Sequence, residues 1–158
     1  MIEMSLAGVR VELPSNQPIV LLKEQVGDRF LPIWVGAAEA AAIAFALQGV
    51  ATPRPMTHDL MKTVLEEMGV ALEKVSITEL RDGTFYALVH FRQNGSSFEI
   101  SSRPSDALAL AVRWECPIFA DEEVLSEASI LIPSDENEEQ ELEKFREFLD
   151  QVTPEDFA

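Results

Sequence analysis

The chain opens with apolar and polar residues alternating at the spacing of β-strands. Residues 2–13 alternate with a phase slip at Ala7 and Gly8, which predicts a single strand interrupted by a β-bulge. Apolar runs at 19–22 and 30–35, bounded by turn residues, predict two further strands. The pattern therefore predicts three strands in hairpin succession at the start of the domain.

Two segments then change to the period of an α-helix. Residues 36–48 are rich in alanine, and their larger apolar residues recur at helical spacing, which predicts a buried helix that another backbone can approach closely. Residues 57–69 carry an apolar stripe, with Thr57 as the predicted N-cap and Gly69 at the end. Two successive helices are therefore expected between residues 36 and 69.

A second group of strands follows these helices. Segments 70–80, 84–92 and 97–101 alternate apolar and polar residues. They are joined by Asp82-Gly83 and Asn94-Gly95, dipeptides that favour tight hairpin turns. The pattern predicts a three-stranded meander.

A third helix is predicted from Pro104 to Arg113. Proline suits the first helical turn, where its missing N–H costs nothing, and the alanine and leucine residues behind it have high helix propensity. A short strand at 117–120 and a short acidic helix at 121–127 are expected next. These elements complete a predicted domain over residues 1–133.

Residues 134–158 have a different composition. They hold ten acidic and two basic side chains, so they carry half of the net charge of −16. An acidic linker is predicted first, followed by a C-terminal amphipathic helix. The apolar residues of that helix are Leu142, Phe145, Phe148, Leu149 and Val152.

Composition narrows the classes of function. With 158 residues, 47% of them apolar, the chain is long enough for one domain with a substantial core. The acidic charge argues against nonspecific binding of nucleic acid through a broad basic surface. Cys116 is the only cysteine, so an intrachain disulfide and a cysteine-based zinc site are excluded. Without a signal-peptide pattern or a long apolar run, we expect a cytoplasmic protein with no membrane partner.

Polar side chains stand at the start of each of the three main predicted helices. They are Glu39 in the first, His58-Asp59 in the second and Ser105-Asp106 in the third. Taken singly, each is explained by helix capping or by the helix dipole, and His58 by an ordinary surface position. Capping does not require a guanidinium, so Arg103, directly before Pro104, calls for a functional or pairing explanation.

If the three helix starts face one cleft, their carboxylates form a candidate metal site. Glu39, Asp59 and Asp106 would supply the oxygen ligands that Mg²⁺ or Mn²⁺ prefers. Arginines near the helices could then bind phosphate. They are Arg54, Arg103 and Arg113. No organic cofactor is expected, because the sequence has neither a glycine-rich phosphate loop nor a dinucleotide fingerprint.

Three motifs, in this order and spacing, resemble the bifunctional nuclease domain family. They are residues 31–44, with the run Leu-Pro-Ile-Trp-Val-Gly before the alanine-rich helix; residues 55–60, Pro-Met-Thr-His-Asp-Leu; and residues 103–113. The resemblance covers residues 1–133. Residues 143–150 are similar to the terminal region of actinobacterial members.

The resemblance implies an α+β fold: a mixed, largely antiparallel sheet with three main helices, to which the C-terminal amphipathic helix is added. It also implies a nuclease acting on DNA and RNA, and a homodimer or higher homo-oligomer. Positions inside the family motifs become the candidate catalytic residues. These are Glu39, His58, Asp59, Arg103, Ser105 and Asp106.

The leading hypothesis is a phosphodiesterase of nucleic acids. Glu39, Asp59 or Asp106 would position a cation, His58 would act as general base or acid, and Arg103 would stabilise charge on the phosphate. The rival is a noncatalytic interaction or regulatory module, in which Arg103 and Asp106 form a structural pair. A third reading, a small-ligand pocket beside the alanine-rich helix, stays open.

Overall fold

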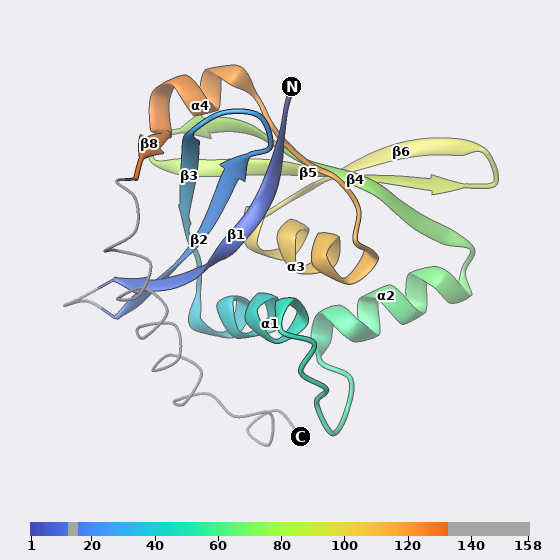
Figure 1. Ribbon diagram of the computed structural model, residues 1–158. Helices are drawn as coiled ribbons and strands as arrows, with labels where there is room; N and C mark the ends of the chain where they lie inside the picture. Colours follow the sequence, from blue (N-terminus) through green and yellow to red (C-terminus); the bar gives the residue numbers. More distant parts are fainter. Residues whose placement is uncertain (13–15, 133–158) are drawn as a thin grey trace.

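The computed structural model describes residues 1–12 and 16–132 as one eight-stranded sheet with four helices (Figure 1). The strands are β1 (Ile2–Glu12), β2 (Gln17–Glu24), β3 (Arg29–Trp34), β4 (Val70–Arg81), β5 (Thr84–Gln93), β6 (Ser96–Ser102), β7 (Ile118–Ala120) and β8 (Ile130–Leu131). The helices are α1 (Ala37–Leu47), α2 (Thr57–Glu67), α3 (Pro104–Trp114) and α4 (Glu122–Ala128). The predicted helices and strands are thus present, and β8 is an addition.

The first three strands form the predicted hairpin succession. β1 pairs antiparallel with β2, and the register shifts between Leu6 and Gly8, so the predicted bulge is confirmed. β2 pairs antiparallel with β3. At the far edge β8 adds two residues to β3.

Two tight turns shape the meander β4-β5-β6. Asp82 and Gly83 have φ of 52° and 76°, and Asn94 and Gly95 have φ of 51° and 80°. Positive φ at both central residues is the geometry that Asp-Gly and Asn-Gly adopt readily in hairpins. The hairpin dipeptides therefore mark both turns, as predicted.

Strand β7 joins the two halves of the sheet. It lies between β4 and β1 in the order β6-β5-β4-β7-β1-β2-β3-β8. It runs parallel to β4 and antiparallel to β1, while every other neighbouring pair is antiparallel. This arrangement confirms the α+β fold with a mixed, largely antiparallel sheet.

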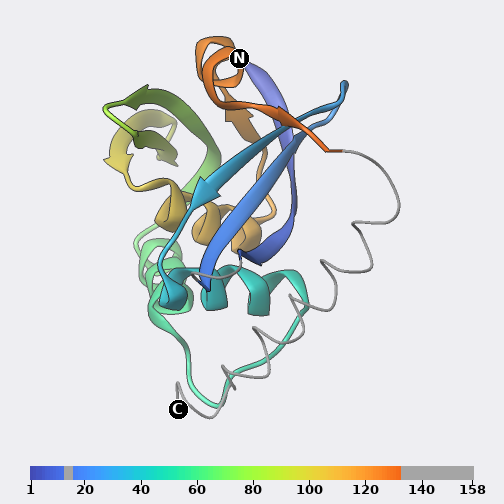
Figure 2. The same ribbon diagram turned by 90° about the vertical axis from the view of Figure 1, so that its left-hand side faces the viewer.

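Helices α1 and α3 pack against each other beside the sheet (Figures 1 and 2). The residues Ala40 to Ala44 of α1 are buried, as are Ala107, Ala109 and Ala111 of α3. Small side chains allow two helix axes to come close, which explains the alanine-rich sequences of both helices. The prediction of a closely packed, buried helix is confirmed for α1.

Helix α2 lies at the edge of this layer. The apolar stripe predicted for it points largely to solvent, because Leu60, Met61, Val64 and Met68 are 41–62% exposed. Only Leu65 of the stripe packs against the core. Within residues 1–12 and 16–132, the stripe is therefore mostly exposed surface and not the internal contact of α2.

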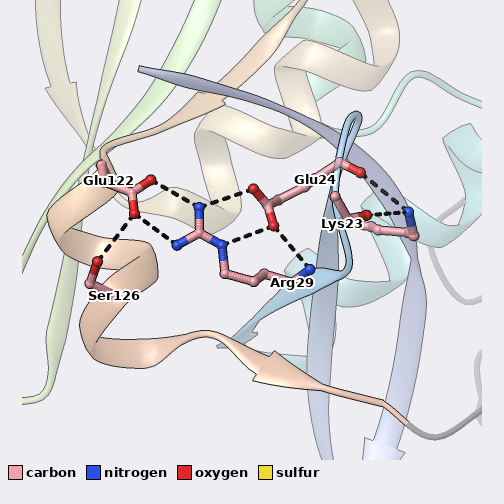
Figure 3. A network of polar contacts seen from close by, with 6 residues as sticks. Lys23, Glu24, Arg29, Glu122 and Ser126 are labelled. Carbon is pink, nitrogen blue, oxygen red and sulfur yellow. Dashed lines mark hydrogen bonds and ion pairs between the residues drawn. The ribbon is translucent and has the colours of Figure 1, made fainter.

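Helix α4 lies at the opposite end of the sheet from α1 (Figure 1). It is tied to the β2-β3 hairpin by Arg29, which contacts the carboxylates of Glu24 and Glu122 (Figure 3). Ser126 donates to Glu122, and Val124 and Leu125 enter the core. We call Arg29, Glu24 and Glu122 the hairpin network.

The predicted acidic linker and C-terminal amphipathic helix lie outside the described residues. Among the residues that are described, no helix is long and apolar enough to cross a membrane. The cytoplasmic location stays a prediction.

Candidate active site

The N-terminus of α1 places Glu39 by means of a close approach to glycine. Gly36 is the N-cap, and Glu39 stands in the first turn. A Cβ atom on Gly36 would meet the carboxylate of Glu39. A side chain at position 36 would therefore require the end of the Glu39 side chain to move.

The N-terminus of α3 begins with Arg103 as N-cap and Pro104 in the first turn. The Arg103 side chain makes no capping bond. Its Nε instead donates to Oδ2 of Asp106 over 2.9 Å. Helix capping and the helix dipole, one explanation that the sequence allowed for Asp106, do not account for this contact, which matches the alternative of an Arg103–Asp106 pair.

The second partner of Asp106 is His58. The Nε2 atom of His58 lies 2.9 Å from Oδ1 of Asp106, and only 8% of the histidine side chain is exposed. The sequence permitted an ordinary surface position for His58, and burial against α3 replaces that interpretation. Since one ring nitrogen faces the carboxylate, Nδ1 is the nitrogen left for another partner.

Arg103 extends the same contacts to α1. Its Nη2 donates to Oε1 of Glu39 over 3.0 Å. The sequence Glu39, Arg103, Asp106, His58 is thus one chain of hydrogen bonds across the N-termini of three helices. We call these four residues the helix-start cluster.

Asp59 does not join the helix-start cluster. Its Oδ1 accepts a 2.6 Å hydrogen bond from Nε of Arg113, and its Oδ2 accepts the backbone N–H of Met56 over 2.9 Å. Met56, not Thr57, is the N-cap of α2, so the predicted cap is corrected by one residue. Asp59, at the third position of the helix, thus accepts the N–H of the N-cap residue, which is one half of a capping box.

The three arginines proposed for phosphate binding differ in availability. Arg113 is 7% exposed and donates to Asp59 and to the carbonyls of Ala109 and Ala42, so all three of its nitrogens are used. Arg54 is exposed, and its guanidinium pairs with no described residue. The Arg103 side chain is 65% exposed despite its two carboxylate partners. Arg103 and Arg54 are therefore the cations that can reach a phosphate.

The charges of the cluster stabilise one another. Burial acts to raise the pKa of Asp106, but the hydrogen bonds from Arg103 and His58 outweigh it and hold the pKa below 3.8. Hydrogen bonds to Asp106 and Glu39 raise the pKa of Arg103 above its ordinary value. Burial likewise opposes the hydrogen bonds from Met56 and Arg113 at Asp59, whose pKa also ends below 3.8. These groups are ionised at neutral pH.

The donor set bears on the predicted Mg²⁺ or Mn²⁺ site. A guanidinium joins Glu39 to Asp106, in the place where a cation would bridge the two carboxylates, and Asp59 is turned to Arg113. Among the described residues no three His, Cys, Asp or Glu side chains are grouped to hold a metal ion. This arrangement does not fit a cation between Glu39 and Asp106 while Arg103 stays in place.

The last candidate, Ser105, is 6% exposed and stands in the first turn of α3 beside Asp106.

Gly36 and Arg113 were not among the predicted catalytic residues, although both shape the surroundings of those residues. A glycine three residues before a helical glutamate was the signal for Gly36. Arg113 was predicted only as a phosphate-binding arginine. Its contacts with Asp59 and with the carbonyl of Ala42 had no local signal, because these partners lie 54 and 71 residues away in the chain.

Comparison with known proteins gives this arrangement a family. The sequence profile of the bifunctional nuclease domain matches residues 20–133, which include the whole helix-start cluster. The chain belongs to the bifunctional nuclease domain family. The three motifs that predicted this membership are those that place Glu39, His58, Arg103 and Asp106.

Two kinds of relative fall within the family. An uncharacterized protein of Mycobacterium tuberculosis is 49% identical over 162 residues, 98% of this chain and 97% of its own length. Bifunctional nuclease 1 of Oryza sativa subsp. japonica is 33% identical over 106 residues, 65% of this chain and 32% of the rice protein. Bifunctional nuclease 1 of Arabidopsis thaliana is 30% identical over 112 residues, 67% of this chain and 34% of that protein. The chain thus spans about a third of the plant nucleases it matches.

Proposed function

We propose that this bifunctional nuclease domain hydrolyses phosphodiester bonds of DNA and RNA at the helix-start cluster. The observation that carries the proposal is the contact of His58 with Asp106, which is also bound to an arginine that is 65% exposed. A histidine oriented by a carboxylate, beside a solvent-facing guanidinium, is a combination suited to phosphoryl chemistry. The names of the plant relatives add support for this class of reaction.

Each residue of the cluster has a role in this proposal. Arg103 binds a nonbridging phosphate oxygen and stabilises the charge that builds on it. Water attacks phosphorus, Nδ1 of His58 takes the proton, and the bond from phosphorus to the leaving oxygen breaks. The leaving oxygen takes its proton from solvent. Asp106 orients His58 and stabilises its protonated form, while Glu39 holds Arg103 in position.

The start of α3 contributes a second group of donors. The unpaired N–H groups of a first helical turn, together with the helix dipole, favour an anion there. The Ser105 hydroxyl stands in this turn and is assigned to the same phosphate. The proposed phosphate position therefore lies between the Arg103 guanidinium and the first turn of α3.

The test is a nuclease assay on single-stranded DNA and RNA. Wild type is compared with Asp106→Asn and Arg103→Ala, each purified in the same way and each measured with Mg²⁺, Mn²⁺ or EDTA. Loss of activity of about a hundredfold or more in both variants is expected if they act in the transition state. Equal activity in all three preparations would show that a contaminant cleaves the substrate.

The same assay addresses the predicted metal. Activity that survives EDTA is expected if Arg103 supplies the charge at the phosphate. Activity that requires Mg²⁺ or Mn²⁺ would mean that Arg103 moves away and that Glu39 and Asp106 bind the cation, with or without Asp59.

A second candidate function rests on one observation, the direct pairing of Arg103 with Asp106. In this reading the family motifs hold three helices together and the domain is a noncatalytic interaction or regulatory module. The net charge of −16 also favours a partner other than nucleic acid. Wild-type protein without activity on any substrate, combined with a large loss of stability in Arg103→Ala, would favour the module.

We also propose that two or more copies of the chain associate. The exposed stripe of α2 supports this, because four apolar side chains in one row are rarely left to water. Light scattering after size exclusion measures the mass. Val64→Glu, in the middle of the stripe, should yield a monomer, and a monomeric wild type would refute the proposal.

A further inference from the structure

A pocket of about 480 Å³, partly open to solvent, lies beside the first turns of α2, and we call it the cavity. Its walls come from the end of α1, from the loop at 50–56, from α2 and from α3. This size is typical of pockets for small organic ligands. Neither the phosphate chemistry nor the core packing described above accounts for it.

Part of the cavity wall is apolar. Phe45, Val50, Pro55, Met56 and Val112 line it. Such side chains favour contact with the faces of a planar ring. Polar groups make up as much of the exposed wall as apolar ones, so the cavity suits a heteroaromatic ligand that also carries hydrogen-bonding groups.

The polar groups in the cavity wall narrow the class of ligand further. Asp59 lines the cavity, and its charge is already balanced by Arg113, so the pocket has no excess charge for an ionic ligand. The hydroxyl groups of Thr52 and Thr63 donate to the carbonyls of Arg54 and Asp59. The side chains of Asp59, Thr52 and Thr63 are thus left as acceptors, which require a neutral ligand that carries N–H donors.

The position of the cavity connects it with the proposed reaction. Two consecutive residues of α2 face different sites, since His58 contacts Asp106 and Asp59 lines the cavity. Arg54 is exposed and follows the lining residues Ala51 and Thr52 in the loop. A ligand held by its ring in the cavity would leave its attached groups near Arg54 and near the start of α2.

We propose that the cavity binds a nucleobase that bears an exocyclic amino group, with Asp59 and the threonine oxygens accepting from that group. This inference rests on the proposed function, because the base belongs to a nucleic acid whose phosphate lies at Arg103. Cytosine, adenine and guanine carry the amino group, and uracil and thymine do not. The cavity thereby adds base selectivity to a site whose phosphate contacts have none.

The test uses free nucleosides, which contain no phosphodiester bond and cannot be cleaved. Cytidine and uridine form a pair that differs at one edge of the ring: cytidine has an amino group at C4 and a bare N3, whereas uridine has a carbonyl at C4 and an N–H at N3. Cytidine therefore offers two N–H donors at this edge and uridine one. Titration followed by calorimetry or by NMR shifts is expected to show cytidine binding at least tenfold more tightly than uridine. The NMR shifts should fall on residues of the cavity wall.

Two variants locate the binding. Ala46→Phe fills the cavity from α1 and should weaken cytidine binding at least tenfold, whereas Leu47→Phe, on the exposed side of the same helix, should leave it unchanged. Thr63→Val removes one acceptor at nearly constant size and should weaken cytidine binding severalfold. If Ala46→Phe lowers Tm far more than Leu47→Phe does, the change in cytidine binding caused by Thr63→Val becomes the deciding result.

Three results would overturn the inference: no cytidine binding, equal binding of cytidine and uridine, or cytidine binding that neither Ala46→Phe nor Thr63→Val weakens. Because nucleosides report on binding alone, the proposed function can fail separately. Cytidine binding without nuclease activity would refute the proposed hydrolysis and support base binding in the cavity. Nuclease activity without cytidine binding would support the hydrolysis and refute base binding in the cavity.

Discussion

The hairpin network and the helix-start cluster use the same chemistry for different ends. In each, one arginine bridges two carboxylates: Arg29 joins Glu24 to Glu122, and Arg103 joins Glu39 to Asp106. In each, one carboxylate lies so close to a glycine, Gly27 or Gly36, that a Cβ atom there would require the carboxylate to move. The resemblance extends from the charges to the backbone.

Exposure separates the two. Arg29 is 29% exposed and makes four side-chain hydrogen bonds to its two carboxylates, whereas Arg103 is 65% exposed and makes two (Figure 3). Only the helix-start cluster includes a histidine, His58. An arginine saturated by carboxylates fixes structure, and one that keeps free N–H groups in solvent can bind an anion.

The largest expected effect would separate the networks by activity. His58→Gln should lower the nuclease rate by about 10²–10⁴, because it removes the proposed general base and keeps a side chain that can hydrogen-bond to Asp106. Arg29→Met should leave the rate per folded molecule unchanged. The measurement is the initial rate of cleavage of a labelled oligonucleotide. A similar loss of rate in both variants would mean that the two networks do not differ in their role in the reaction.

Stability should rank the networks in the opposite order. Arg29→Met leaves Glu24, whose side chain is 7% exposed, without its cation, so Tm should fall by several degrees. Arg103→Met removes contacts of a mostly exposed side chain and should lower Tm less. Thermal unfolding followed by circular dichroism at neutral pH compares them. A larger fall for Arg103→Met would favour the structural module over the nuclease.

A smaller effect should come from Gly36→Ala. The added methyl group displaces Glu39 and frees Arg103 on one side, while Asp106 and His58 keep their contacts. If Glu39 positions Arg103 with the energy of an exposed ion pair, loss of this contact should lower the nuclease rate about two- to fivefold. Ala38→Gly, at an exposed position in the same turn, is the control for changed helix propensity. Unchanged activity in Gly36→Ala would remove Glu39 from the proposed site.

The smallest effect is a dependence of stability on acid. The folded state holds the pKa of Asp106 below 3.8, so it binds fewer protons than the unfolded chain, and its stabilising contribution is lost as pH falls below about 4. Urea unfolding at pH 6 and pH 3 should show a smaller loss of unfolding free energy for Asp106→Asn than for wild type. Glu66→Gln, on the exposed part of α2, is the control and should behave as wild type does.

Much of the fold was predictable because its signals are local. Alternation marked the strands, Asp-Gly and Asn-Gly marked the turns, and the slip at Ala7-Gly8 marked the bulge. The pairing of strands was not predictable in this way. β7 is three residues long, yet it joins the two halves of the sheet, and its neighbours β4 and β1 are distant in sequence.

The candidate site also combines features that the local sequence determined with features that it did not. The sequence by itself determined the family and the residue types at the three helix starts, because each motif is short and each first helical turn favours polar side chains for local reasons. Only the tertiary structure decided that His58 faces Asp106, that Asp59 turns to Arg113, and that Arg103 joins two helices. Those contacts span 48, 54 and 64 residues, and a charged group takes its partner from whatever the packing of helices brings near.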